Sequence, residues 1–179
     1  AGRLDQDSTG LLILTNDGDL AHELTHPRYE HEKEYEVATS RPLTPEDMRH
    51  LEKGIDLDGQ STWPARVHAV TENEDEDRYV YSVTIHEGRK RQVRRMLQAI
   101  RHDVTSLKRV RMGSLVLGSL PEGEYRPLSE KEVKALMRRG TAAGTLKEKP
   151  ARGAPGRARA PAGTPSPVRR DTPGIRPQD

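Results

Sequence analysis

The pattern of hydrophobic and polar positions predicts a series of short strands along the first part of the chain. Residues 11–14 form a continuous apolar run, which is typical of a buried strand. Residues 34–39 alternate Tyr, Val and Thr with Glu and Ala, and this period of two predicts another strand. Further strands are expected at about residues 65–72, 78–86, 104–112 and 115–117.

Capping signals and helical spacing predict helices between these strands. Thr44 followed by Pro45 is a typical helix start, because Thr caps the first turn and Pro suits its first position. Residues 88–100 carry Val, Met, Leu and Ile at a three-and-four spacing, which predicts a buried stripe. Four helices are expected: one that starts at Asp19 and is stopped by Pro27, one from Thr44 to Gly54, one over about residues 88–100, and one from Ser129 through residue 138.

Composition divides the chain at about residue 139. The chain is 32% hydrophobic and 32% charged with a mean hydropathy of −0.89, which is too polar for a chain that folds throughout. Residues 140–179 are largely Ala, Gly, Pro and Arg, and they cannot bury enough surface to offset the entropy lost on ordering. We therefore expect a folded domain over residues 1–139 and a disordered basic tail over residues 140–179. The tail is interpreted as a solvated extension with a modest, nonspecific attraction to phosphates.

The same composition narrows the chemistry and the location. The chain has no Cys, which removes disulfides, thiol nucleophiles and thiolate metal sites. No apolar run approaches the roughly 20 residues of a membrane span or resembles a signal peptide, so a cytoplasmic protein is expected. The net charge is only +2, but the basic residues are clustered, and local basic clusters attract polyanions.

Asp5 is the first candidate functional residue. It follows Gly2, Arg3 and Leu4 directly and lies just before the apolar run at residues 11–14. A carboxylate at the mouth of a strand can serve as a catalytic acid or as a nucleophile. The same arrangement also forms ordinary polar turns, so the motif alone leaves both interpretations open.

A basic run at residues 89–95 and the tyrosine at position 35 are further candidates. The basic residues form either a solvated helix face or a set of phosphate contacts in which one arginine points into a pocket. An arginine beside Asp5 would keep that carboxylate ionised. Tyr35 is either an ordinary sheet residue or a ring that stacks on a nucleobase.

The segment His22-Glu23-Leu24-Thr25-His26 matches the helical zinc-protease pattern. Pro27 follows at once and is expected to end the helix. A catalytic zinc also needs a third protein ligand, and neither His31 nor an acidic residue stands out for that role. A zinc hydrolase is therefore a distant third hypothesis, and no metal site is expected.

A series of short motifs follows in order over about residues 1–138. Each motif is weak alone, but together they resemble the RsuA-type ribosomal RNA pseudouridine synthase family. The motifs are Gly2-Arg3-Leu4-Asp5, Thr9-Gly10-Leu11-Leu12, Leu14-Thr15-Asn16-Asp17-Gly18, Leu24-Thr25-His26-Pro27, Lys33-Glu34-Tyr35, Glu87-Gly88-Arg89, Arg91-Gln92-Val93-Arg94-Arg95-Met96, Leu107-Lys108-Arg109-Val110-Arg111-Met112-Gly113 and Gly123-Glu124-Tyr125.

The resemblance implies an α+β fold with a mixed, mostly antiparallel sheet, flanking helices and an RNA cleft across the sheet. It also implies isomerisation of a uridine in ribosomal RNA to pseudouridine, without a cofactor or a metal. By this match Asp5 is the catalytic aspartate that attacks the flipped-out nucleotide, Tyr35 packs against the target base, and Arg94 pairs with the aspartate. Leu107 matches an apolar pocket residue. The basic residues expected to contact RNA are Arg3, Arg89, Arg91, Arg95, Lys108 and Arg109.

Two features depart from the family pattern. The order Ser8-Thr9-Gly10 replaces the usual Thr-Ser-Gly. The small S4-type RNA-binding domain and the initial stretch of catalytic domain that usually precede the Gly-Arg-Leu-Asp motif are absent from this sequence. We therefore expect the chain to be a fragment of a longer protein, and we expect a monomer. A catalytically inactive, basic RNA-binding fragment is the alternative hypothesis.

Overall fold

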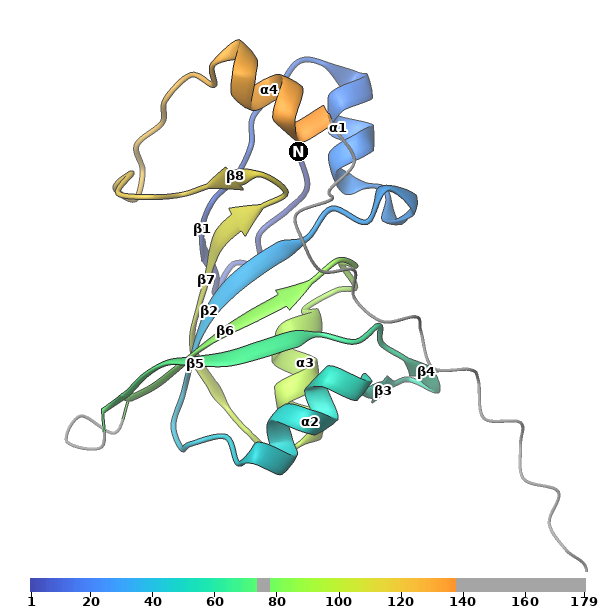
Figure 1. Ribbon diagram of the computed structural model, residues 1–179, viewed down its shortest axis with the longest axis vertical. Helices are drawn as coiled ribbons and strands as arrows, with labels where there is room; N and C mark the ends of the chain where they lie inside the picture. The colour runs from blue at the N-terminus through green and yellow to red at the C-terminus, as the bar shows by residue number, and fades with distance from the viewer. Residues whose placement is uncertain (74–77, 138–179) are drawn as a thin grey trace, which may run out of the picture.

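The computed structural model describes residues 1–73 and 78–137, which form a curved sheet flanked by helices (Figure 1). β1 runs parallel to β7, and the other strand pairs of this sheet are antiparallel. The predicted α+β class with a mixed, mostly antiparallel sheet is therefore confirmed. The strands lie in the order β1 (Thr9–Gly10), β7 (Val104–Met112), β2 (Lys33–Thr39), β6 (Arg78–Ile85) and β5 (Arg66–Asn73), with β8 (Leu115–Val116) paired to β7.

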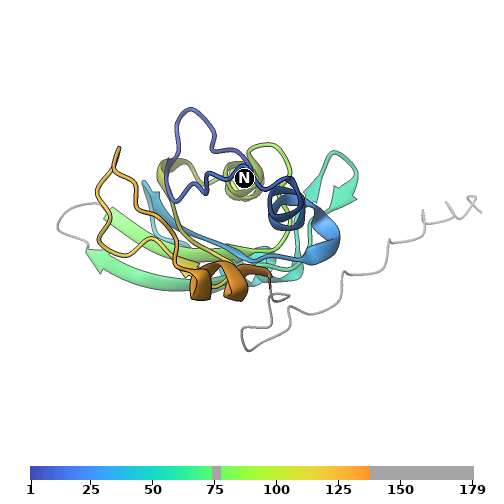
Figure 2. The ribbon, with the colours of Figure 1, turned by 90° about the horizontal axis from the view of Figure 1, so that it is seen from above.

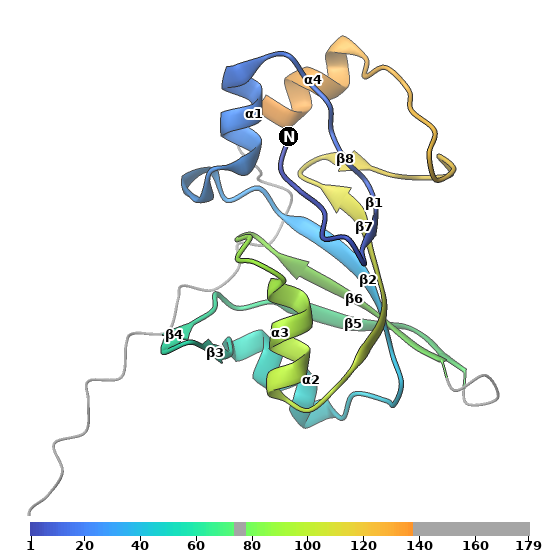
Figure 3. The ribbon, with the colours of Figure 1, turned by 180° about the vertical axis from the view of Figure 1, so that it is seen from behind.

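The helices form two groups around this sheet. α2 (Pro45–Lys53) and α3 (Gln92–Ala99) cover one face of it, whereas α1 (Gly18–Thr25) and α4 (Glu130–Met137) pack together near its opposite end (Figures 1 and 3). A short 3-10 turn, η1 (Pro27–Tyr29), follows α1. A small hairpin that the sequence did not predict, β3 (Asp56–Leu57) and β4 (Gln60–Ser61), lies between α2 and β5.

Reciprocal side-chain caps fix the starts of α2 and α4, at the predicted caps Thr44 and Ser129. The Thr44 hydroxyl accepts a hydrogen bond from the Asp47 amide at 3.1 Å, and the Asp47 carboxylate accepts one from the Thr44 amide at 2.9 Å. Ser129 and Glu132 form the same arrangement at α4. α1 differs by two residues from the prediction, because Asp17 rather than Asp19 provides its N-terminal cap.

Two predicted elements begin or end elsewhere. The run at residues 11–14 alternates between buried and exposed positions, since Leu12 is 44% and Leu14 is 81% exposed, and the pairing with β7 covers only Thr9–Gly10. The helix predicted from residue 88 begins at Gln92, because Arg91 adopts a left-handed conformation with φ 51° and closes a turn before the helix.

Two hydrophobic clusters anchor the fold on either side of the functional region. The first packs α2 and α3 against the sheet and includes Val37, Tyr81 and Met96. The second packs α1 and α4 against the end of β7 and includes Leu24 and Met112. Seen from above, the amino-terminal segment and α3 lie on the same side of the curved sheet (Figure 2).

No helix in residues 1–73 and 78–137 is long and apolar enough to cross a membrane. The predicted tail at residues 140–179 lies outside the described residues, as does residue 138, the predicted end of α4.

Candidate active site

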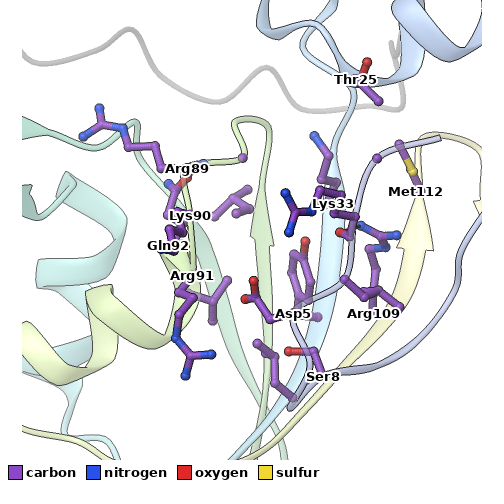
Figure 4. Close-up of a pocket in the computed structure, with 18 residues that line it drawn as sticks. Asp5, Ser8, Thr25, Lys33, Arg89, Lys90, Arg91, Gln92, Arg109 and Met112 are labelled. Atoms are coloured by element: carbon purple, nitrogen blue, oxygen red, sulfur yellow. Dashed lines mark hydrogen bonds between the residues drawn. The ribbon is translucent and has the colours of Figure 1, made fainter.

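A cavity of about 570 Å³ lies between the amino-terminal segment, strands β2 and β7, and the loop that leads into α3 (Figure 4). Apolar side chains from three strands and α3 contribute to its wall, and Tyr35 and Leu107 are among them. Basic side chains provide much of the remaining wall, whereas Asp5 is its one acidic residue in the described part of the chain. The basic residues are Arg3, Lys33, Arg89, Lys90, Arg91 and Arg109. This excess of positive charge favours a polyanionic ligand.

Asp5 faces this cavity from a tight turn. The Ser8 amide donates a hydrogen bond to the Asp5 carbonyl at 3.0 Å, and the chain then enters β1. Figure 4 shows the Asp5 carboxylate between Arg91 on one side and the β2–β7 strands on the other. Within residues 1–73 and 78–137, the Asp5 carboxylate forms no direct ion pair, so it is available to a ligand in the cavity.

Tyr35 lies on β2 directly opposite Arg109 of β7, beside a β-bulge. Burial raises the pKa of the Tyr35 phenol, and the negative charge of Asp5 acts in the same direction, while Arg109 opposes both effects. The side chain is therefore a neutral phenol near Asp5. A neutral aromatic ring at the cavity wall can pack against a planar base.

Arg109 holds the backbone on both sides of Asp5. Its Nε donates to the Leu11 carbonyl at 2.7 Å, and its Nη1 donates to the Arg3 carbonyl at 3.5 Å. The side chain is only 2% exposed, which does not support the prediction that Arg109 contacts RNA. Arg109 instead acts as a positioning residue for the Asp5 turn.

Arg94 does not form the predicted pair with Asp5. Its Nε lies 3.3 Å from Asp7 Oδ2, its Nη2 donates to the Asp7 carbonyl at 2.6 Å, and its Nη1 donates to the Val104 carbonyl at 3.0 Å. These backbone contacts hold Arg94 beside the cavity and direct it to the residue two positions after Asp5. Asp7 also accepts two hydrogen bonds from Arg91, and these bonds, with the nearby charge of Arg94, lower the pKa of the Asp7 carboxyl.

The remaining predicted RNA contacts fall into two groups. Arg89 and Arg95 are engaged in contacts with other residues of the chain: Arg89 donates to the Gln60 and Ser61 carbonyls of β4, and Arg95 forms a 2.6 Å surface ion pair with Asp58. Arg3 and Lys108 are exposed, so they remain candidates for RNA contacts.

Lys33 is a cavity residue that the sequence did not single out for function. Its Nζ donates to the His31 carbonyl at 3.4 Å, and no carboxylate in the described residues forms an ion pair with it. Burial, followed by repulsion from Arg109, lowers the pKa of Lys33 to about 8. The sequence did contain a signal for the place of Lys33 in the cavity wall. It lies two residues before Tyr35, and side chains two apart on a strand share one face.

The folded state should therefore gain stability relative to the Lys33→Met variant as the pH rises. Unfolded protein binds the Lys33 proton up to about pH 10.5, whereas folded protein binds it only below about pH 8, so the free energy of unfolding rises with pH in this window. The difference between wild type and Lys33→Met should change by up to about 3 kcal/mol across it. Urea unfolding at pH 7.5 and at pH 10.5 (with the exposed Lys90→Met as control) measures this change. Parallel profiles for wild type and Lys33→Met would contradict the assignment.

The two histidines of the zinc-protease pattern lie at the carboxyl end of α1 with their ring centroids 4.9 Å apart. α1 ends at Thr25, and His26 lies after it, with its Nδ1 accepting a hydrogen bond from the Arg28 amide at 3.2 Å. Residues 1–73 and 78–137 contain no cluster of three or more His, Cys, Asp or Glu that could hold a metal ion. This geometry offers no support for a zinc hydrolase.

Comparison with known proteins gives one consistent family. The family model described as RNA pseudouridylate synthase matches residues 1–99. Ribosomal large subunit pseudouridine synthase B of Bacillus subtilis is 46% identical over 136 residues, which cover 75% of this chain and 55% of that protein. Ribosomal small subunit pseudouridine synthase A of Escherichia coli K12 is 38% identical over 140 residues, which cover 76% and 58%.

A solved structure agrees with these relatives. The crystal structure of a pseudouridylate synthase superposes with a TM-score of 0.70 at 40% identity and covers 75% of this chain and 57% of that one. The chain thus spans a little over half the length of the relatives that it matches.

Proposed function

Since the chain belongs to the RNA pseudouridylate synthase family, we propose that it isomerises a uridine of ribosomal RNA to pseudouridine with Asp5 as the attacking carboxylate. The observation that carries the proposal is the position of Asp5. Its carboxylate has no ion-pair partner among the described residues, and it faces a cavity with Tyr35 and Leu107 in its wall. The cavity volume falls within the range of roughly 300–1,000 Å³ that is typical of small-molecule sites.

Overall, the N1–C1′ and C5–H bonds of the uridine are replaced by C5–C1′ and N1–H bonds, with no net gain or loss of atoms. The N1–C1′ glycosidic bond of the uridine breaks while the Asp5 carboxylate bonds to the nucleotide and holds it. The uracil turns, C5 bonds to C1′, and the carboxylate is released. The proton on C5 is lost and N1 gains a proton. The Asp5 carboxylate returns to its starting state, and the reaction needs no cofactor.

The cavity residues suit the separate demands of this reaction. The target base must leave its stack, which costs a few kcal/mol, and the cationic wall can offset this cost through backbone phosphate contacts. Tyr35 offers the extruded base a neutral ring beside Asp5. Arg109 keeps the Asp5 turn in place by holding the carbonyls of Arg3 and Leu11.

Arg94 has a more indirect place in this proposal than the sequence predicted. It anchors the Asp5 turn through the Asp7 carbonyl. The hydrogen bonds to Asp7 raise the pKa of Arg91, desolvation opposes this effect, and the charges of Asp7 and then Asp5 add to it, so Arg91 and Asp5 interact electrostatically. The proposed substrate is ribosomal RNA, and the names of the relatives include enzymes of both ribosomal subunits. That the protein is cytoplasmic and that it is a monomer both remain predictions.

The 179-residue chain should convert uridine in protein-free ribosomal RNA. The assay incubates large- and small-subunit RNA with the purified chain and maps pseudouridine by carbodiimide modification and primer extension. A new pseudouridine at a defined position is the expected result. Salt-sensitive binding without conversion would instead favour the inactive RNA-binding fragment, which the partial coverage of the relatives keeps as the second hypothesis.

A further inference from the structure

Asp7 gathers two arginines on the same turn that carries Asp5. Arg91 Nη1 and Nη2 donate to Asp7 Oδ1 and Oδ2, each at 2.8 Å, and Arg94 Nε lies 3.3 Å from Oδ2. Figure 4 shows the Arg91 guanidinium directed away from the Asp5 carboxylate. The Asp7 carboxylate therefore occupies two guanidinium groups on the α3 side of the turn that carries the proposed nucleophile.

We propose that Asp7 occupies, in the free protein, a site where Arg91 and Arg94 bind a phosphodiester group of the RNA. The inference rests on the proposed function, since RNA must approach Asp5 for the site to be used. A guanidinium presents the same planar fork of donors to a carboxylate and to a phosphate. A backbone phosphate next to the extruded nucleotide can therefore replace the Asp7 carboxylate on Arg91.

The exposure of the contact permits this exchange. The side chains of Arg91 and Asp7 are 41% and 46% exposed, so a ligand can reach the ion pair. Arg94 is only 14% exposed, and it is tied to the carbonyls of Val104 and Asp7. Arg94 thus stays in place as the fixed member of the site, and Arg91 changes its partner.

Two other arginines of the cavity wall do not offer such a site. Arg89 donates to two backbone carbonyls of β4 and to Glu87 at 3.2 Å. Arg109 is buried, and it donates to the Leu11 carbonyl. Both guanidinium groups are held largely by backbone carbonyls and leave little exposed surface for a phosphate, whereas at Arg91 a phosphate would replace one exposed anion with another.

The exchange makes Asp7 a competitor of the RNA. Once displaced, its carboxylate loses its partner and stays beside the incoming phosphate, which weakens binding. Removing the Asp7 charge should therefore tighten RNA binding. If the Asp7–Arg91 contact were purely structural, removing the Asp7 charge would loosen the Asp5 turn and would not increase the affinity for RNA.

The Asp7→Asn variant of the full chain tests this inference, with fluorescence anisotropy of a labelled oligouridylate as the readout. We expect binding about three- to fivefold tighter than wild type, the scale of one exposed ion pair. The plot of log K against log salt should become steeper by about one. Glu132→Gln is the matched control, because Glu132 also forms an exposed ion pair, with Arg126 at 2.7 Å, and it should change the affinity by less than about twofold.

A double-mutant cycle assigns the effect to Arg91. Arg91→Gln should weaken oligouridylate binding more in the Asp7→Asn background than in wild type, since wild-type Arg91 must first leave Asp7. Unchanged or weaker binding by Asp7→Asn would overturn the inference. Loss of folding by this variant, detected by thermal unfolding, would also overturn it, because the contact would then be structural.

Turnover is measured separately so that the two proposals can fail independently. Tighter binding by Asp7→Asn, with no pseudouridine formed by wild type, would support the phosphate site and reject the proposed function. Pseudouridine formation by wild type, with equal RNA affinity for wild type and Asp7→Asn, would support the function and reject the exchange.

Discussion

Replacing Asp5 with asparagine is expected to lower the single-turnover rate of pseudouridine formation by at least about 10³-fold. Asparagine has nearly the same shape as aspartate, but its amide is a far weaker nucleophile than a carboxylate. The turn that holds residue 5 depends on backbone contacts, from the Ser8 amide and through the Arg109 side chain, so this geometry should survive the change. The loss should therefore reflect chemistry rather than folding.

Measuring the RNA affinity of Asp5→Asn distinguishes a loss of chemistry from a loss of RNA binding. Asp5 is the one acidic residue among the described residues of the cavity wall, so removing its charge should leave binding equal to wild type or slightly tighter. Rates at saturating ribosomal RNA and anisotropy with the same RNA measure the two quantities. Asp5→Asn protein that forms pseudouridine at the wild-type rate would remove Asp5 from the mechanism.

Gly10→Ala is expected to destabilise the protein by about 3 kcal/mol or more. Gly10 has φ +103°, and a Cβ at this position would lie 2.3 Å from the Arg109 carbonyl oxygen and 2.7 Å from the Arg109 amide nitrogen. Both atoms belong to the β7 backbone, which cannot yield as a flexible side chain does. β1 would have to move away from β7, and the Asp5 turn that precedes it would move as well.

Urea unfolding measures this effect, and Gly18→Ala provides the matched control. Gly18 is the first residue of α1, and nothing lies within 4 Å of a Cβ added there. Alanine at Gly18 should be neutral or stabilising by up to about 1 kcal/mol, because it restricts the unfolded chain. Equal free energies of unfolding for Gly10→Ala and wild type would contradict the close approach of β1 to β7.

Elements with strong local signals were predicted well from the sequence. The helix α2 starts and ends where it was expected to, at Thr44–Pro45 and at Gly54, because caps and glycine stops act through neighbouring residues. The period of two likewise predicted a strand over residues 34–39, and β2 occupies Lys33–Thr39. These features need little information from the rest of the chain.

Elements defined by distant contacts were predicted less well. The apolar run at residues 11–14 suggested a buried strand, but the pairing with β7 ends at Gly10, and Leu12 and Leu14 face outward. The late start of α3 depends on the left-handed conformation of Arg91, which no local motif indicates. The β3–β4 hairpin has too few residues to show a period.

The roles of the arginines could not be assigned from charge alone. Arg94 and Arg109 both lie in basic runs, yet one binds Asp7 and the other is buried against the Asp5 turn. A useful signal was present for Arg109: it lies two residues after Leu107 on the same strand, and so it shares the inward face of that pocket residue. The partner of Arg94 depends on the path of the turn after Asp5, which only the folded structure reveals.

A crystal structure of the Asp5→Asn variant bound to a uridine-containing ribosomal RNA fragment tests the central claim most directly. The account predicts an extruded uridine in the cavity, with its ring against Tyr35 and Leu107 and its glycosidic bond beside the residue 5 side chain. RNA bound elsewhere on the protein, with this cavity empty and every uridine stacked in its helix, would contradict it.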